Sequence, residues 1–373
     1  MKTVRNLLYR DVLWSVLFVT LFFVALFFFI DFVDEMSRVG RNGYTMAAAA
    51  LATLLEQPGH VYELFPIAVL IGTIYSMARL AQSAEFTILR TAGLGPGRAL
   101  SLLGVIGLLF AVLTFSLGEY VTPHSEQAAA FLKARFGMGL AIGRNGAWLK
   151  ERRTDPEGER SITVNVRGVG KNGELTGVRI FEMDTSGREV RSLLAEHAIV
   201  PRTRTISDWT LQDVTETDWI PRTPTSEPRV ETRKLPQLNW PTRLNASVAA
   251  AALLPAQSMG TVALWRYSTH LAEQEQSTQN YRILFWKRVL YPFACLVMVA
   301  LALPFAYLHA RAGGVSVKVF GGIMLGISFV LLNNVVGHLG LLHEWTPWIA
   351  ASVPSVVYLL MSMSAFAWLV RYR

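Results

Sequence analysis

Six stretches of this 373-residue chain are long and apolar enough to cross a lipid bilayer as helices. A transmembrane helix needs about 20 mostly apolar residues to span the hydrocarbon core. The second stretch is the most polar, because Glu63 and Pro66 lie near one end, but Glu63 can reach the interface. We therefore predict six transmembrane helices, at Val12–Val33, Val61–Ala78, Ala99–Gly118, Val289–Leu308, Val319–Val336 and Trp348–Val370.

The composition also favours membrane burial. Charged residues make up 17% of the chain and hydrophobic residues 52%, whereas soluble globular proteins carry about 25% charge. The net charge is +8, and the basic residues are scattered without an aromatic-basic stripe. In a membrane protein such an excess is typical of basic cytoplasmic loops and of contact with anionic lipids. We therefore expect no nucleic acid partner.

The N-terminal apolar run argues against a cleaved signal peptide, and the single cysteine argues against disulfide and thiolate-metal sites. The run follows Lys2, Arg5 and Arg10, as in a signal peptide. However, it is long enough to span, and no small-residue cleavage site precedes Asp31, so we predict a retained helix. The only cysteine, Cys295, excludes an internal disulfide and a thiolate metal cluster.

A long polar region separates the third apolar stretch from the fourth. Within it, short runs of β-branched and aromatic residues alternate with turn signals such as Asp184-Thr-Ser-Gly187. This pattern is typical of an antiparallel sandwich or jelly roll with one solvated face. The predicted fold is a polytopic α-helical membrane protein, with three helices on each side of an inserted all-β jelly-roll-like domain. The predicted parts are an N-terminal transmembrane half at 1–144, the β-domain at 145–245, a helical connector at 246–288 and a C-terminal transmembrane half at 289–373.

The short loops predict how the chain is oriented, because cytoplasmic loops are enriched in Lys and Arg. With the N-terminus inside, the opposite short loops carry only Arg38 and Arg41. Both termini are therefore predicted to be cytoplasmic and the β-domain to be extracytoplasmic. The basic residues on the inner side are Lys2, Arg5, Arg10, Arg79, Arg90, Arg98, Arg311, Lys318, Arg371 and Arg373.

The segment from Arg79 to Arg98 is too polar and basic to cross the membrane. Its small and apolar residues recur at three- and four-residue spacing, and the Gly-Leu-Gly-Pro-Gly string at 93–97 ends the pattern. We predict a short cytoplasmic helix over residues 79–92 that lies flat on the membrane. Such a helix is either a plain connector or a docking surface for a soluble partner.

The chain carries no recognisable catalytic or nucleotide-binding motif. Gly168-Val-Gly-Lys171 resembles a phosphate loop only superficially, because Asn172 stands where Ser or Thr should follow the lysine. The histidines form no HExxH pattern and no metal-like cluster. We therefore predict a protein that is not an enzyme, binds no metal and holds no cofactor. Any ATP-driven work would need an ATPase on another chain.

Four basic residues on the translocated side are candidates for binding lipid phosphate. Guanidinium and ammonium groups form charge-assisted hydrogen bonds with phosphate oxygens. The alternative is that these side chains simply reach the interface, and Asp31 and Asp34 reduce the positive charge near two of them. The candidates are Arg38, Arg41, Lys287 and Arg288.

The layout and several short strings resemble the lipopolysaccharide-export ABC transporter permeases, the LptF/LptG family. Each string is short, but together and in this order they cover essentially the whole chain. The string that begins at Leu80 and the string that begins at Gly118 are more similar to the G member than to the F member. The strings are Phe32-Val-Asp34 with Gly43-Tyr44, Leu80-Ala-Gln82 with Glu85 and Ala92-Gly93, Gly118-Glu119-Tyr-Val-Thr-Pro123 with Glu126-Gln127, and Trp286-Lys287 with Pro292.

The resemblance implies a permease subunit in the inner membrane of a Gram-negative bacterium. Such a subunit extracts lipopolysaccharide from the outer leaflet and passes it to a periplasmic bridge. The implied partners are an LptF-like second permease, a cytoplasmic LptB-like ATPase dimer that binds ATP and Mg²⁺, and a bitopic LptC-like protein. The implied path for the acyl chains is a dry cavity between the two permeases, lined by their first and fifth helices.

The resemblance also assigns a role to the cytoplasmic helix, which becomes the coupling helix seated in the ATPase. Glu85 matches the glutamate of the family's coupling helix. We add Arg90, Leu80 and Ile88 as further predicted contacts, Arg90 on electrostatic grounds. One position departs from the family pattern, because some members carry a lysine where this chain has Asp31. Lipid phosphate would then fall to the four basic candidates.

Two other functions stay open at this point. One is a permease of another lipid or lipoprotein ABC exporter, although that layout usually has four spans with the large domain after the first. The other is a membrane-anchored β-domain scaffold without transport, for which a single span would suffice.

Overall fold

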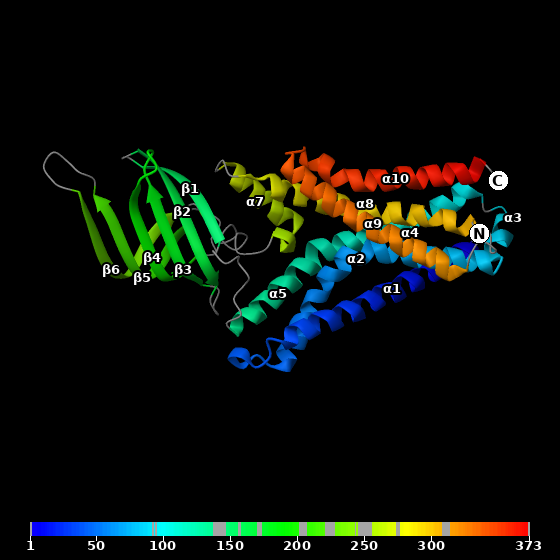
Figure 1. The fold of residues 1–373 in the computed structure, drawn as a ribbon, viewed down its shortest axis with the longest axis horizontal. Coiled ribbons are helices and arrows are strands. Elements are labelled where there is room, and N and C mark those ends of the chain that lie inside the picture. The colour runs from blue at the N-terminus through cyan, green and yellow to red at the C-terminus, as the bar shows by residue number, and fades with distance from the viewer. Residues whose placement is uncertain are drawn as a thin grey trace. The chain divides into compact units, whose positions relative to one another are not determined.

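The computed structural model describes residues 2–91, 93, 95–136, 147–155, 158–169, 174–200, 207–220, 228–242, 244, 256–273, 277–307 and 314–371. The chain forms two compact units, one helical and one built around a β-sheet (Figure 1). The helical unit comprises Met1–Ser37, Ala49–Glu126 and Gln279–Arg373, and the β unit comprises Arg38–Ala48 and Gln127–Thr278. The β unit is thus inserted between two runs of helices, as predicted.

Six helices among the described residues are long and apolar enough to cross a membrane, which confirms the predicted number and order of spans. Each predicted stretch lies inside the apolar helical segment found there, except at two ends. Leu308 falls outside the described residues, and Leu369 and Val370 lie in the last helix beyond Trp368, where the apolar segment ends. The helices are α1 (Lys2–Met36), α2 (Met46–Gln82), α4 (Pro96–Ser116), α8 (Gln279–Tyr307), α9 (Val315–Leu342) and α10 (Pro347–Arg371).

Helix α2 is longer than predicted, because it begins at Met46. Pro66 lies inside it without ending it. A proline leaves a carbonyl of the preceding turn without its helical donor. Here the Tyr291 hydroxyl of α8 donates to the Glu63 carbonyl, one turn before the proline. The carbonyl that Pro66 leaves without a helical donor is that of Tyr62, so the contact at Glu63 ties α8 to this turn without replacing the missing bond.

Glycines bring the transmembrane helices into close contact. A Cβ on Gly72 of α2 would lie 2.7 Å from the Val16 Cα of α1, so the two backbones nearly touch where the helices cross. A Cβ on Gly326 of α9 would lie 2.6 Å from Ile67 Cγ2 of α2. Small residues at such crossings let membrane helices gain packing contacts in lipid. The buried core around them includes Leu8, Val12, Leu70, Ile74, Met77, Ile106 and Met298.

The β unit contains one six-stranded antiparallel sheet, which confirms the predicted all-β insert. Each strand pairs with the next strand in the chain, so the connectivity is a meander (Figure 1). The strands are β1 (Ala147–Asp155), β2 (Gly158–Val169), β3 (Leu175–Met183), β4 (Glu189–Ile199), β5 (Ser207–Ile220) and β6 (Arg229–Thr242).

The predicted turn at Asp184 joins β3 to β4. The Asp184 carboxylate accepts hydrogen bonds from the Ser186 hydroxyl at 2.6 Å and from the Arg188 backbone N–H at 2.9 Å. Gly187 has a φ of 77°, a left-handed conformation that glycine adopts without steric cost. The turn is therefore held by the side chain that the sequence pattern singles out.

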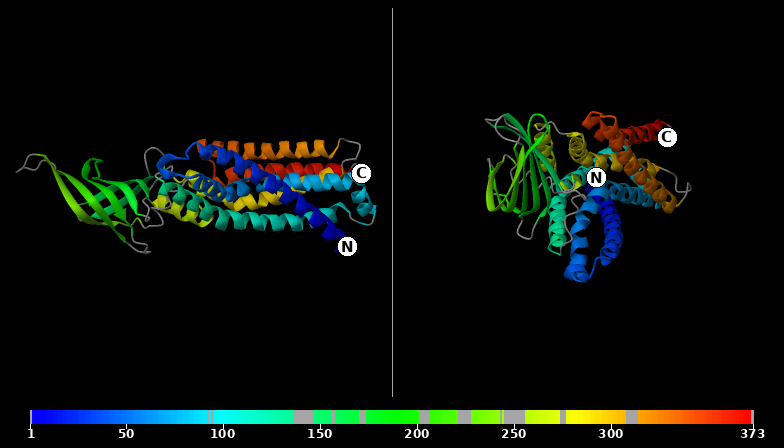
Figure 2. Two further views of the ribbon diagram at one scale, coloured as in Figure 1. Left: turned by 90° about the horizontal axis from the view of Figure 1, so that it is seen from below. Right: turned by 60° about the vertical axis from the view of Figure 1, so that its left-hand side comes forward.

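The sheet is strongly curved (Figure 2), and side chains of its two edge strands reach across to the other strand. Arg153 of β1 donates from Nη1 to the Pro241 carbonyl of β6 at 2.8 Å, although β1 and β6 stand at opposite ends of the strand order. Curling buries one face of a single sheet. The unit therefore has the enclosed inner face of the predicted jelly-roll-like domain, with simpler connections.

A row of irregular positions crosses this sheet and changes the face to which side chains point. In a regular strand, residues on one face are two positions apart. On β4 the buried residues Ala195 and Ala198, and on β5 Leu211 and Val214, are three positions apart instead. Left-handed φ angles at Gly177 (61°) and Asp213 (52°) mark the row on β3 and β5. Five positions that stand opposite one another on adjacent strands are left out of the strand pairing. They are Arg167, Gly177, Glu196, Asp213 and Pro236.

Shorter helical segments connect these parts of the chain. One of them is a π-helix between α4 and α5, where the backbone hydrogen bonds skip one residue more than in an α-helix. On α7, Leu264, Tyr267 and Leu271 are buried, whereas Val262 and Trp265 are exposed. The segments are η1 (Arg41–Gly43), α3 (Glu85–Thr91), the π-helix η2 (Leu117–Val121), α5 (Thr122–Arg135), η3 (Ala256–Ser258) and α7 (Thr261–Glu273).

Candidate functional site

The predicted cytoplasmic helix is present, but it is shorter than residues 79–92. Helix α2 runs on to Gln82, and Ala84, with a left-handed φ of 61°, separates it from α3. Helix α3 begins at Glu85 and ends at Thr91. Its end is followed by Gly93 at a φ of 96°, as the glycine-rich string predicts. A single helix starting at Arg79 is therefore wrong, because the break at Ala84 belongs to a backbone conformation that the apolar spacing does not reveal.

Helix α3 has one face packed on the helical unit and one face open. Phe86 is buried, and its ring meets the Tyr307 ring of α8 edge to face, with centroids 5.0 Å apart. Leu89 packs against the same core. Glu85 and Ile88 are exposed, Ile88 by 64% of its surface. The open face therefore carries an acidic and an apolar side chain.

The four predicted coupling residues thus have different surroundings. Glu85 and Ile88 lie on the open face of α3. Leu80 is 2% exposed in α2 and belongs to the buried core, so it contributes to packing under α3 and not to an exposed surface. Arg90 lies in α3, but its side chain is outside the described residues. Sequence reasoning missed Phe86, although its three-residue spacing from Leu89 is a helical apolar pattern.

A charged contact ties α1 to the end of α2, two turns before α3. Arg79 Nη2 donates to Asp11 Oδ1, and the Ser76 hydroxyl donates to Asp11 Oδ2 at 3.4 Å. Arg79 is therefore fixed by a contact within this chain, close to the break between α2 and α3.

The two basic candidates on α8 are turned toward neighbouring helices. Lys287 Nζ donates to the Asn333 carbonyl of α9 at 2.9 Å. Arg288 Nη1 donates to the Gly118 carbonyl at 2.7 Å, and its guanidinium lies 5.5 Å from the centre of the Tyr62 ring. Gly118 lies in the π-helix just before Pro123, where the missing N–H leaves a carbonyl in need of a donor. Arg288 supplies that donor.

The basic candidates after α1 are exposed and lie in a different part of the chain. Arg38 and Arg41 belong to the β unit, whereas Lys287 and Arg288 belong to the helical unit. Around Arg41, left-handed φ angles at Gly40 (91°) and Asn42 (49°) form a tight turn. Binding of lipid phosphate by any of the four stays a prediction, and for the two on α8 it would compete with the contacts just described.

Asp31 and His60 form a pair that sequence reasoning did not anticipate. His60 Nε2 lies 2.8 Å from Asp31 Oδ2, and Gln57 Nε2 donates to the same oxygen at 3.3 Å. The Phe27 ring stacks on His60 with centroids 4.8 Å apart. The partners are 29 positions apart on α1 and α2, so only helix packing brings them together. An aspartate in an otherwise apolar run is the one hint that the sequence offers.

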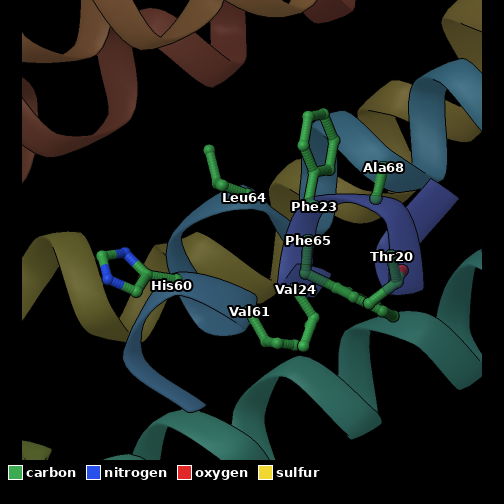
Figure 3. A pocket seen from close by; sticks show the side chains of 8 residues that line it. All are labelled: Thr20, Phe23, Val24, His60, Val61, Leu64, Phe65 and Ala68. Carbon is green, nitrogen blue, oxygen red and sulfur yellow. The ribbon is translucent and has the colours of Figure 1, made fainter. Parts of the chain in front are cut away.

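His60 also lines a small pocket between α1 and α2 (Figure 3). The remaining lining is mostly apolar, and no group of three potential metal ligands occurs among the described residues. The pocket is therefore an apolar gap beside the Asp31–His60 pair. Its other lining residues are Thr20, Phe23, Val24, Val61, Leu64, Phe65 and Ala68.

Comparison with known proteins decides the family. The sequence model of the lipopolysaccharide export system permease LptF/LptG family matches residues 6–371. The chain belongs to this family. It is similar to the lipopolysaccharide export system permease protein LptG of Escherichia coli K12, with 26% identity over 94% of both chains. It is also similar to the LptG protein of Haemophilus influenzae Rd, with 24% identity over 96% of this chain and 97% of that one.

In a permease of the LptF/LptG family, six apolar helices make a multi-pass membrane protein, and their exposed apolar faces meet lipid or another subunit. Helices α1 and α9, the first and fifth spans, both carry long exposed apolar faces. These are the two helices that the family resemblance assigns to the lipid cavity. The exposed residues on them include Phe18, Phe22, Phe29, Ile30, Phe320, Met324, Ile327 and Leu331.

Proposed function

We propose that this LptF/LptG-family permease is a G-type subunit that extracts lipopolysaccharide from the inner membrane and delivers it toward a periplasmic bridge. Both relatives compared above are named LptG. The open face of α3, between two membrane-spanning helices, carries the proposal, because it is an unfilled surface for a soluble motor. We propose that both termini and α3 face the cytoplasm, and that the β unit faces the periplasm.

The work required explains why the permease needs such a motor. Pulling an acyl chain from lipid into water costs about 0.8 kcal/mol for each methylene. A lipid with several acyl chains therefore cannot leave the bilayer unaided. The exposed apolar faces of α1 and α9 would keep the chains out of water, in a cavity shared with an LptF-like second permease. An LptC-like partner would receive the lipid beyond the membrane.

The coupling route is short in this chain. An LptB-like ATPase dimer, which holds the ATP and Mg²⁺, would contact Glu85 and Ile88 on the open face of α3. Movement of α3 would reach α8 directly, because Phe86 packs on Tyr307. This permease itself needs no cofactor in that scheme.

The test compares two substitutions on the open face of α3. Glu85→Ala removes the carboxylate, and Thr87→Ala is the matched control, because Thr87 is also exposed on α3. The complex is purified from native membranes, its subunits are identified by mass spectrometry, and it is reconstituted with lipopolysaccharide. Glu85→Ala should insert and assemble normally but release several-fold less lipid per ATP hydrolysed, whereas Thr87→Ala should behave as the unmodified chain. Equal coupling in both variants would count against Glu85. Isolation of this chain without an ATPase or a second permease would count against the transporter itself.

A further inference from the structure

Helix α1 packs on the rest of the helical unit mainly through its first turns. The buried residues there are Leu8, Val12, Ser15 and Val16, each at most 8% exposed. Over residues 17–34, which the structure describes throughout, every residue of α1 is exposed or half-buried. In the most apolar stretch of each helix, 6% of the residues of α1 are buried, against 78% for α2. The first turns of α1 are therefore its main attachment to the helical unit.

At these turns α2 holds a carboxylate of α1 with two donors. Asp11 accepts a hydrogen bond from Arg79 at Oδ1 and another from the Ser76 hydroxyl at Oδ2, 3.4 Å away. Ser76 and Arg79 are three positions apart, so they project from the same side of α2. The Asp11 side chain is 17% exposed, and Ser76 is fully buried. Two donors on one carboxylate fix the position of α1 along α2 as well as its distance from α2.

The packing beside this contact brings the two helices together without fixing their register. Five residues further along α1, the backbone of Val16 nearly touches Gly72 of α2. Glycine has no side chain that could interlock with α1, and contacts between apolar side chains are not directional. A slip of α1 by one helical rise, about 1.5 Å, would keep most apolar contacts but would pull Asp11 away from Arg79. The register of the two helices therefore depends on the Asp11–Arg79 contact.

A second polar contact ties α1 to α2 near the other end of α1. Asp31 lies against His60 and accepts a hydrogen bond from Gln57. Asp11 and Asp31 are 20 positions apart, so the two contacts stand about 30 Å apart along α1. Between them α1 presents its exposed apolar face. Moving α1 at Asp11 while Asp31 stays in contact would therefore tilt this apolar face.

Arg79 stands where α2 gives way to α3. Its carbonyl accepts the backbone N–H of Ser83 at 3.0 Å. Helix α2 ends at Gln82, Ala84 follows in a left-handed conformation, and Glu85 begins α3 six positions after Arg79. The last turn of α2, which carries the Arg79 guanidinium, is thus the turn that a moving α3 would displace.

We propose that Arg79 is a positioning residue for transport, which makes α1 follow the end of α2 when a motor moves α3. The exposed apolar face of α1 is then displaced in each cycle of ATP hydrolysis. This inference rests on the proposed function, since it takes α3 to be the contact with the motor. It adds a second route to the one through Phe86, which leads to α8. Asp11 receives the movement, and Ser76 keeps its carboxylate oriented.

Distance measurements in the assembled, full-length transporter test this displacement directly. The background is Cys295→Ser, which keeps a hydrogen-bonding partner for the Thr114 hydroxyl. Spin labels are attached at Leu21→Cys on α1 and Met363→Cys on α10, two exposed positions, and their separation is measured without nucleotide and with ATP and vanadate.

The separation of the labels should change when the motor is trapped with ATP and vanadate. Arg79→Met should remove at least half of that change, because α1 no longer follows the end of α2. Arg10→Met is the matched control, since it removes the same charge from the exposed neighbour of Asp11 on α1, and it should keep the full change.

Lipid delivery from proteoliposomes is measured on the same variants, together with ATP hydrolysis and thermal stability. Asp11→Asn and Arg79→Met should each deliver several-fold less lipopolysaccharide per ATP hydrolysed. The double variant should deliver no less than either single variant, because the two residues act through one contact. Assembly and ATP hydrolysis should persist, since the packing of Phe86 is unchanged, and Arg10→Met should match the unmodified chain. If Arg79→Met does not assemble, Asp11→Asn decides, because it keeps the shape of the side chain and the acceptor for Ser76.

The outcomes separate a moving contact from one that only holds the fold. Lower thermal stability with unchanged lipid delivery per ATP would overturn the proposal. A full change of label separation in Arg79→Met, or no change in the unmodified chain, would overturn it as well, and so would additive losses in the double variant. Absence of lipid delivery by the unmodified complex would instead refute the proposed function.

Discussion

Replacing Gly72 with alanine should force α1 away from α2. The added Cβ would lie 2.7 Å from both the Cα and the N of Val16, and 2.8 Å from its Cγ2. Two of these three atoms belong to the backbone, so a change of rotamer cannot relieve the overlap. The helices must move apart by about 0.7 Å to restore an ordinary contact of 3.4 Å.

The cost follows from what α1 loses when it moves. Leu8, Val12 and Val16 are its buried contacts with the core, and a gap of 0.5–1 Å forfeits about a quarter to a half of each dispersion contact. Overpacking of this kind destabilises proteins by about 1–3 kcal/mol. Alanine has the better helix propensity by about 1 kcal/mol, which offsets part of that cost and makes the direction of the net change informative.

The assay is thermal unfolding of the purified full-length chain in detergent, followed by loss of helical circular dichroism. Gly104→Ala on α4 is the matched control, because it is also a glycine in a transmembrane helix but its Cβ would meet nothing within 4 Å. Gly72→Ala should unfold at a lower temperature than the unmodified chain, and Gly104→Ala at the same or a slightly higher temperature. If both variants unfold together at or above the unmodified chain, the close crossing of α1 and α2 is refuted.

Three further substitutions test side-chain contacts that are seen in the structure. Arg288→Met removes the donor to the Gly118 carbonyl and should lower the free energy of unfolding by about 1.5–3 kcal/mol. The control is Arg282→Met, at an exposed position on the same helix, which should cause no change. Equal unfolding temperatures for the two variants would contradict the role of Arg288. Asp31→Ala breaks the contact with His60 and should increase the mobility of a spin label at Val33 more than Asp34→Ala does, whereas equal spectra would refute that link. The Ser186 hydroxyl and the Arg188 N–H hold the pKa of Asp184 below its usual range, so the charged carboxylate stabilises the turn at neutral pH and loses this effect as pH falls through the lowered pKa. The difference in stability between the unmodified chain and Asp184→Asn should therefore shrink with acid, and a constant difference from pH 7 to pH 2 would contradict it.

The apolar stretches were sufficient to predict the helical architecture. Each of the six stretches must satisfy its backbone polar groups internally in lipid, and a helix does so with local hydrogen bonds. The strands were predictable for a similar local reason, because alternating residues and turn signals such as Asp184-Thr-Ser-Gly187 act over a few positions. The start of α2 at Met46 was not predictable, because the helix continues through Pro58, a residue type that usually ends or kinks a helix.

The candidate site divides in the same way. The position of α3 between two spans and its glycine-rich end follow from nearby residues, so Glu85 could be placed on a short helix from the sequence. Leu80 faces the core, whereas Ile88 is exposed. This difference follows from tertiary packing, in which α3 is seated through Phe86, and cannot be read from the sequence. Lys287 and Arg288 looked like phosphate ligands because their charge is visible in the sequence, whereas the carbonyls that they reach on other helices are not.

By itself, the sequence determined which segments are helices and strands, in what order they come, and which family the chain resembles, because these properties depend on residue type and short spacing. Only the tertiary structure decided which polar groups meet. The Asp31–His60 pair joins residues 29 positions apart, and the bond between Glu151 and Thr242 joins residues 91 apart. Contacts at such separations are set by helix crossing and sheet curvature, which arise from packing of the whole chain and leave no local pattern in the residues that take part.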